Sequence, residues 1–161
     1  AIPFIEEHGA IGTALDKTIK NFIDTGKLER VEAPVTPNVK EGYEHIFGLL
    51  EKCKWLKEID FVEHSKSILN KEYVYSGELD AIGTYEGALA ICDFKKTKQI
   101  TGETKKKYFM QLSAYAKALE GEVDALVILS PYNEPIVTTE IDKYFGHFLI
   151  SRGMYKQRFG I

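Results

Sequence analysis

Two strand-like runs, joined by a short turn near the middle of the chain, constrain the fold more than any other feature of the sequence. Residues 73–84 and 88–95 are rich in the aromatic and β-branched side chains that strands favour. Between them lies Tyr85-Glu86-Gly87, which carries the glycine that a tight turn favours. The pattern predicts a β-hairpin.

Three polar residues of this hairpin are expected to converge. Side chains alternate between the two faces of a strand, so Asp93 and Lys95 point the same way. Asp80 lies on the partner strand and can meet them across the pair. Carboxylate oxygens are ligands of Mg²⁺ and Mn²⁺, and a cation beside the metal can orient a water or steady phosphate charge. The three residues therefore favour a site for phosphodiester hydrolysis.

Two further residues extend this set. Gln111 and Tyr115 lie one turn apart on the next predicted helix, residues 103–119, and so share a face. The series Gly77-x-x-Asp80, Asp93-x-Lys95 and Gln111-x-x-x-Tyr115 resembles the PD-(D/E)xK nuclease superfamily. Within it, the series is most similar to the RecB-type exonuclease branch, which includes stand-alone phage and mitochondrial exonucleases and has Gln-x-x-x-Tyr as its distinguishing motif. The resemblance covers the second half of the chain well and the first half in outline.

The resemblance implies an α/β fold with a restriction-endonuclease-like core, in which helices flank a mixed central sheet. It also implies a DNA exonuclease that depends on Mg²⁺ or Mn²⁺ and acts on single-stranded or processed DNA ends. Asp80, Asp93 and the backbone carbonyl of Phe94 would hold the metal, and Lys95 would position or activate the attacking water. Gln111 would orient Lys95 or bind a phosphate of the substrate, and Tyr115 would support the site or contact the DNA backbone.

Asp16 and Glu63 are the candidates for completing the metal shell. Many RecB-type nucleases have a histidine where this chain has Asp16, and an acidic residue often precedes the Gly-x-x-Asp motif, as Glu63 does here. A solvent-facing carboxylate is the alternative for each residue. For Asp80, Asp93 and Lys95 together, the alternative is an ion-paired cluster without a metal, which is unfavourable in a buried site unless every group is paired.

The charge of the chain is compatible with a nucleic-acid partner. The net charge is -3, but binding depends on the local potential, and two lysine runs flank the proposed site. We expect Lys96 and Lys98 of the first run, and Lys105 and Lys106 of the second, to contact phosphates. Solvated lysines are the alternative. No helicase segment is recognisable, so a helicase or recombination protein is expected as the partner for unwinding.

The two cysteines, Cys53 and Cys92, are too few for a four-cysteine iron–sulfur cluster. We expect both to be reduced thiols of an intracellular or cytoplasmic protein. No apolar run approaches the roughly 20 residues of a membrane helix, and the first residues lack the features of a signal peptide. The resemblance to phage exonucleases makes a phage gene one candidate source.

The remaining segments complete an α/β pattern. Periodicity predicts helices over residues 6–24, 38–56 and 141–159, and strands over residues 59–69, 123–129 and 136–140, with residues 130–135 as a turn. With 161 residues and no recognisable linker, a single nuclease domain spanning residues 1–161 is expected.

Two functions from different classes remain open. The first is the active exonuclease. The second is a catalytically inactive nuclease-fold module that binds nucleic acid or a partner protein. The presence of Asp80, Asp93 and Lys95 favours the enzyme, whereas Asp16 at the histidine position keeps the binding module open. An endonuclease is a third candidate, which the Gln-x-x-x-Tyr motif disfavours.

Overall fold

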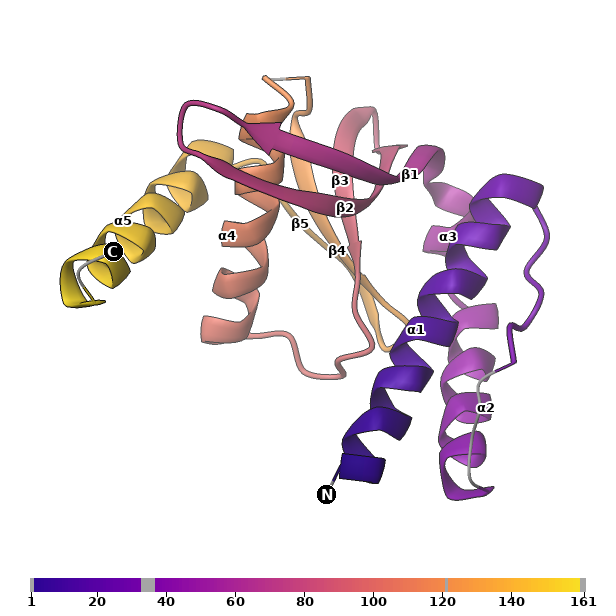
Figure 1. The fold of residues 1–161 in the computed structure, drawn as a ribbon. Coiled ribbons are helices and arrows are strands. Elements are labelled where there is room, and N and C mark those ends of the chain that lie inside the picture. The colour runs from indigo at the N-terminus through magenta and orange to yellow at the C-terminus, as the bar shows by residue number, and fades with distance from the viewer. Residues whose placement is uncertain (1, 33–36, 121, 160–161) are drawn as a thin grey trace.

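The computed structural model places one five-stranded sheet between two groups of helices (Figure 1). It describes residues 2–32, 37–120 and 122–159, without the side chains of 2–8, 38 and 154–159. In chain order the elements are α1 (Ile2–Thr25), α2 (Pro37–Glu51), α3 (Trp55–Glu58), β1 (Asp60–Asn70), β2 (Tyr75–Tyr85), β3 (Ala88–Phe94), α4 (Gly102–Ala118), β4 (Ala125–Ser130), β5 (Asn133–Thr138) and α5 (Ile141–Phe159).

The sheet is mixed and its strands lie in chain order, β1-β2-β3-β4-β5. The pairs β1–β2, β2–β3 and β4–β5 are antiparallel, whereas β3 and β4 are parallel and α4 connects them. Glu86 and Gly87 have positive φ angles of 50° and 82° and form the two-residue turn between β2 and β3. Positive φ at both central residues matches the twist of the flanking strands. The predicted hairpin is confirmed.

Each face of the sheet has its own core layer, so the fold has three layers. On one face, α1, α2 and α3 pack against alternate residues of the central strands, such as Cys92 and Val127. On the other face, α4 packs against the residues between them, such as Ile91 and Ile128. Every residue of β4 is buried, as its continuous apolar sequence predicts for a strand covered on both faces. Within the described ranges, each helix is too short or too polar to be a membrane span.

The predicted helix over residues 38–56 is wrong at its end. The structure ends α2 at Glu51 and starts α3 at Trp55. The amides of Lys52 and Cys53 donate to carbonyls three residues earlier, which tightens and ends the helix. The indole of Trp55 donates to the carbonyl of Ser130 at 3.3 Å, so α3 is tied to the end of β4.

The predicted turn over residues 130–135 is also wrong. Ser130 pairs with Asn133, and β5 begins there rather than at Ile136. The hydroxyl of Ser130 accepts a hydrogen bond from the amide of Tyr132 at 3.1 Å and closes a shorter turn. Pro135 lies inside β5, which is an edge strand, so the amide hydrogen that proline lacks is not needed by a neighbouring strand.

Candidate active site

Asp80 and Asp93 meet where β2 and β3 run side by side. The amide of Phe94, one residue after Asp93, donates to Oδ2 of Asp80 at 2.9 Å. The alternation of β2 is interrupted here, because Leu79 packs in the core layer of α4 and Ala81 in that of α1. Ser65, which lies in β1 opposite this point, has a φ of 56° in the left-handed region. The irregular backbone leaves the Asp80 carboxyl group beside the end of β3.

The two carboxyl groups interact strongly. Burial raises the pKa of Asp80 to about 7, and both a hydrogen bond with Asp93 and the charge of Asp93 contribute to this rise. The hydrogen bond from the Phe94 amide and the charge of Lys20 act in the opposite direction. Without a metal, therefore, Asp80 stays protonated up to about neutral pH, because it is buried beside a second carboxyl group.

Asp93 has one oxygen whose hydrogen-bonding capacity is unused. The residue is 7% exposed, and its Oδ2 lies 3.2 Å from Nζ of Lys95. That separation makes an ion pair, but the arrangement does not meet hydrogen-bond geometry. Within the part of the chain that the structure describes, Oδ2 is a buried oxygen without a hydrogen-bond partner. Such an atom is unfavourable unless something else binds it.

Lys95 is held as a cation. Burial by itself lowers the pKa of its ammonium group, but the nearby charge of Asp93, with further contributions from Tyr108 and Asp80, outweighs burial, so that the pKa is raised above its ordinary value. Its Nζ lies 4.5 Å from the ring centroid of Tyr108 on α4, a cation–π distance. The hydroxyl of Tyr108 lies 3.2 Å from Oγ1 of Thr97. Tyr108 is not among the predicted site residues, although its place three residues before Gln111 puts it on the same helix face.

Gln111 and Tyr115 contact each other. Nε2 of Gln111 donates to the hydroxyl of Tyr115 at 2.8 Å. Burial raises the pKa of Tyr115, the hydrogen bond from Gln111 lowers it, and the charges of Asp93 and Asp80 raise it, so Tyr115 lies within electrostatic range of both carboxylates. Its ring also packs on Gly77: a Cβ at Gly77 would lie 2.9 Å from Cε1 of Tyr115. The glycine of the first motif thus makes room for the tyrosine of the third.

The candidates for completing the metal shell lie in different surroundings. Asp16 on α1 forms an ion pair with Lys20 at 2.9 Å; burial and the nearby charge of Asp80 contribute to raising its pKa. Glu63 is paired with Lys66 at 3.1 Å on β1, and its side chain is 43% exposed. The ring of Phe94 stacks on Trp55, while its amide binds Asp80.

The predicted phosphate-binding lysines surround the start of α4. Lys96 and Lys98 lie in the loop between β3 and α4, and Lys105 and Lys106 lie in the first turns of α4. Burial lowers the pKa of Lys96. Lys98 is exposed, and its carbonyl accepts a hydrogen bond from Asn133 at 2.9 Å, which fixes the loop against β5.

The carboxylate pair fits a hard divalent cation. Mg²⁺ is usually bound through one or two carboxylates, with waters and phosphate oxygens completing its shell. Asp80 and Asp93 supply two adjacent carboxylates, and Oδ2 of Asp93 is a buried acceptor that a cation would satisfy. Among the described side chains, no three from histidine, cysteine, aspartate and glutamate converge closely enough to form a ready metal site. The donor set therefore fits a metal that shares its shell with substrate and water.

Asp80 also makes the stability of the metal-free protein depend on pH. Its folded pKa of about 7 lies above the ordinary 3.8, so its contribution to stability is complete below pH 3.8 and is lost as the pH rises through 7. We expect this contribution to fall by about 1.4 kcal/mol per pH unit within that window. Denaturant unfolding in EDTA should show it as a pH-dependent difference between the wild type and Asp80→Asn. Parallel stability profiles for the two proteins would contradict the shift.

Comparisons with known proteins bear on the fold. No family model and no curated protein matches the chain. The chain is similar to a crystal structure described as a "Putative exonuclease" from Eubacterium rectale, with a TM-score of 0.60 and 17% sequence identity. The match covers 92% of this chain and 64% of that one, so this chain spans less than two thirds of its neighbour. A second solved structure, of SSO0001, aligns with a TM-score of only 0.34 at 20% identity, over 71% of this chain and 61% of that one.

The first of these likenesses, together with the sheet and its flanking helices, shows an α/β fold with a five-stranded mixed sheet, which is consistent with a restriction-endonuclease-like core. The predicted fold class is confirmed. At 17% identity the likeness carries no residue roles, so the functions of Asp80, Asp93 and Lys95 stay predictions.

Proposed function

We propose that the chain is a metal-dependent nuclease that hydrolyses phosphodiester bonds at the ends of DNA. The observation that supports this most is the convergence of Asp80, Asp93 and Lys95, in which a buried carboxylate oxygen faces a lysine ammonium group at 3.2 Å without a hydrogen bond. A purely structural cluster would be expected to give such an atom a hydrogen bond as well as an ion pair. The similarity of the fold to that of a neighbour named as an exonuclease is consistent with this function.

Asp80 and Asp93 would hold Mg²⁺ or Mn²⁺, with the carbonyl of Phe94 as a further ligand by resemblance to the RecB-type nucleases. When bound, the metal would supply Lewis acidity toward the phosphate and lower the pKa of a water. The amide of Phe94 keeps Asp80 oriented through its 2.9 Å hydrogen bond. Because Asp80 has a pKa of about 7 in the metal-free site, it must give up a proton before it can act as a ligand at neutral pH.

Lys95 would orient the attacking water and neutralise charge that develops on the phosphate. The raised pKa of its ammonium group disfavours a role as the base that takes a proton from water. Tyr108 lies beside the ammonium group and limits its movement. Gln111 and Tyr115 are coupled by a hydrogen bond, so they would contact the DNA backbone as a unit rather than orient Lys95 separately.

Action on strand ends rests on the Gln111-x-x-x-Tyr115 motif and its resemblance to exonucleases. The lysines of the β3–α4 loop and of α4 would contact the strand that leads into the site. A helicase or recombination protein is proposed as the partner that provides single-stranded ends.

The decisive experiment is degradation of end-labelled single-stranded and double-stranded DNA with Mg²⁺, Mn²⁺ or EDTA. We expect stepwise shortening with either metal and none in EDTA, and the labelled end reveals the polarity. A covalently closed single-stranded circle is the matched control, because it has no ends. Cleavage of the circle would show that the protein does not need DNA ends, which contradicts the exonuclease function but not nuclease activity as such.

One observation favours a catalytically inactive binding module as the second candidate. Asp16, the third carboxylate near the pair, is bound by Lys20 at 2.9 Å, and the described residues contain no cluster of three ligands. The same DNA degradation experiment separates the two functions. If the protein binds DNA but does not cleave it with either metal, the nuclease function is rejected and the binding module is favoured.

A further inference from the structure

We propose that Lys20 is a substrate-binding residue, whose ammonium group binds a backbone phosphate of the DNA strand on the α1 side of the Asp80–Asp93 pair. This inference rests on the proposed nuclease function and adds a residue that neither the sequence motifs nor the comparisons point to. Lys20 follows Asp16 by one helical turn and is ion-paired with it at 2.9 Å.

Helix α1 presents a row of residues, one turn apart, of which the first contacts the loop that follows β3 and the last contacts strand β1. Gly12 begins the row: a Cβ there would lie 3.8 Å from Cδ and Cε of Lys96, so the stem of Lys96 runs along the helix. Asp24 ends the row and contacts His64 of β1. Asp16 and Lys20 lie between these two contacts, so they are confined near the strands.

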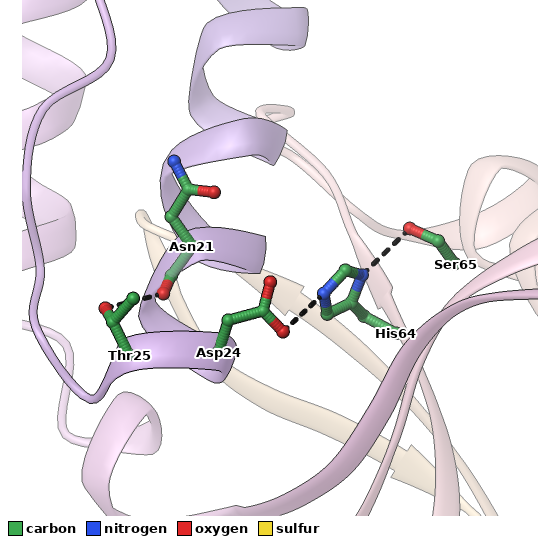
Figure 2. Close-up of polar contacts among 5 residues, drawn as sticks. All are labelled: Asn21, Asp24, Thr25, His64 and Ser65. Atoms are coloured by element: carbon green, nitrogen blue, oxygen red, sulfur yellow. Dashed lines mark hydrogen bonds and ion pairs between the residues drawn. The ribbon is translucent and has the colours of Figure 1, made fainter.

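The contact at the end of α1 fixes this arrangement (Figure 2). Oδ1 of Asp24 lies 2.8 Å from Nε2 of His64, and Nδ1 of His64 lies 3.0 Å from the hydroxyl of Ser65. Ser65 occupies the irregular point of β1 that faces Asp80 across the register of β1 and β2. The helix is therefore tied to the sheet beside the carboxylate pair.

The environment of Lys20 is unusual for a lysine. Its side chain is only 17% exposed, and lysine is seldom so buried unless it is paired. Its charge acts on Asp80 as well as on Asp16, which places the ammonium group within electrostatic range of the metal-binding candidates. A partly buried cation at that place is positioned to meet a phosphate that enters the site.

Lys20 and Lys95 approach the carboxylate pair from opposite layers. Lys95 lies against Tyr108 of α4, whereas Lys20 belongs to α1, which packs on the other face of the sheet. Once a divalent cation is bound, the three carboxylates of Asp16, Asp80 and Asp93 and the two ammonium groups leave one positive charge in excess. A phosphodiester carries the single negative charge that balances it. Lys20 would exchange part of its contact with Asp16 for that phosphate.

The test measures binding of a fluorescent single-stranded oligonucleotide with Mg²⁺ at several salt concentrations. Lys20→Met keeps the apolar stem but removes the charge, and a Lys95→Ala background prevents cleavage. We expect Lys20→Met to weaken binding roughly tenfold and to reduce the slope of log K against log salt by about 0.7, the value of one phosphate contact on a single strand. Lys20→Arg should restore the slope, and Lys17→Met, at an exposed position on the same helix, should leave it unchanged.

In the otherwise wild-type enzyme, Lys20→Met should raise KM for DNA roughly tenfold while kcat changes little, because a contact made before and during reaction affects binding alone. If a folded Lys20→Met variant shows the wild-type salt dependence of binding and the wild-type KM, the inference is overturned, even if the enzyme cuts DNA. If the variant lowers the slope of log K against log salt but the wild type never cuts DNA, phosphate binding by Lys20 is supported and the nuclease function is rejected. If the single variant does not fold, Asp16→Asn/Lys20→Met removes the ion pair as a unit, and the same loss of slope is expected.

Discussion

Replacing Lys95 with alanine is expected to slow the degradation of DNA by roughly three powers of ten or more, because positioned acid–base and electrostatic groups each contribute factors of that order. The change removes the ammonium group that lies 3.2 Å from Oδ2 of Asp93 and 4.5 Å from the ring centroid of Tyr108. Single-turnover rates on end-labelled DNA with saturating Mg²⁺ measure the effect.

The fold should survive this change. Asp80 can hold a proton in the metal-free protein, so the loss of Lys95 leaves one uncompensated negative charge in the pair rather than two. Lys57→Ala, which removes an exposed lysine of α3, is the matched control and should keep the wild-type rate. If the Lys95→Ala variant degrades DNA at a rate within a few-fold of the wild-type rate, Lys95 has no catalytic role.

Replacing Asp93 with asparagine is expected to abolish both metal binding and DNA degradation. The substitution keeps the size of the side chain but removes the charge of a buried carboxylate whose Oδ2 has no hydrogen-bond partner among the described residues. Loss of one of the two carboxylate ligands should weaken Mn²⁺ binding by roughly 100-fold or more, because mutation of residues that only hydrogen-bond to metal ligands already costs up to about 100-fold in affinity. Titration of free Mn²⁺ by electron paramagnetic resonance measures this affinity without substrate.

Asp124→Asn is the control for Asp93→Asn. The amide of Asp124 donates to the carbonyl of Leu89, which places this exposed aspartate at the start of β3, whereas Asp93 lies near its end. Its replacement removes the same charge from the protein but should leave Mn²⁺ affinity unchanged. Equal affinities in the Asp93→Asn variant and the wild type would exclude Asp93 as a ligand.

Local patterns in the sequence predict much of the sheet and its carboxylate pair. Alternation along residues 88–95 puts Asp93 and Lys95 on one face, and the structure pairs them. The turn at Glu86-Gly87 sets the register of β2 and β3, which pairs Ala81 with Cys92 and so brings Asp80 close to Asp93. The interruption of alternation at Asp80 could not be predicted from residues 73–84 alone, because it coincides with the left-handed backbone of Ser65, which lies opposite in another strand.

Contacts between distant segments account for the rest. The sequence places Gln111 and Tyr115 on one helix face, but it does not reveal that their side chains bind each other. Tyr108 shares that face, but only the structure shows that Lys95 lies above its ring. The Asp24–His64 contact that ties α1 to β1 joins residues 40 positions apart, and no local pattern in the sequence encodes such a contact.

The close packing of Gly77 and Tyr115 makes two motifs of the chain mutually dependent. With 2.9 Å between a Cβ at position 77 and the tyrosine ring, even an alanine at that position requires the ring to move. A larger residue at position 77 is therefore expected to be better tolerated when position 115 becomes smaller at the same time, because a smaller side chain there leaves room for it. A search for variants that randomises one position alone would discard combinations that only a paired library can reach.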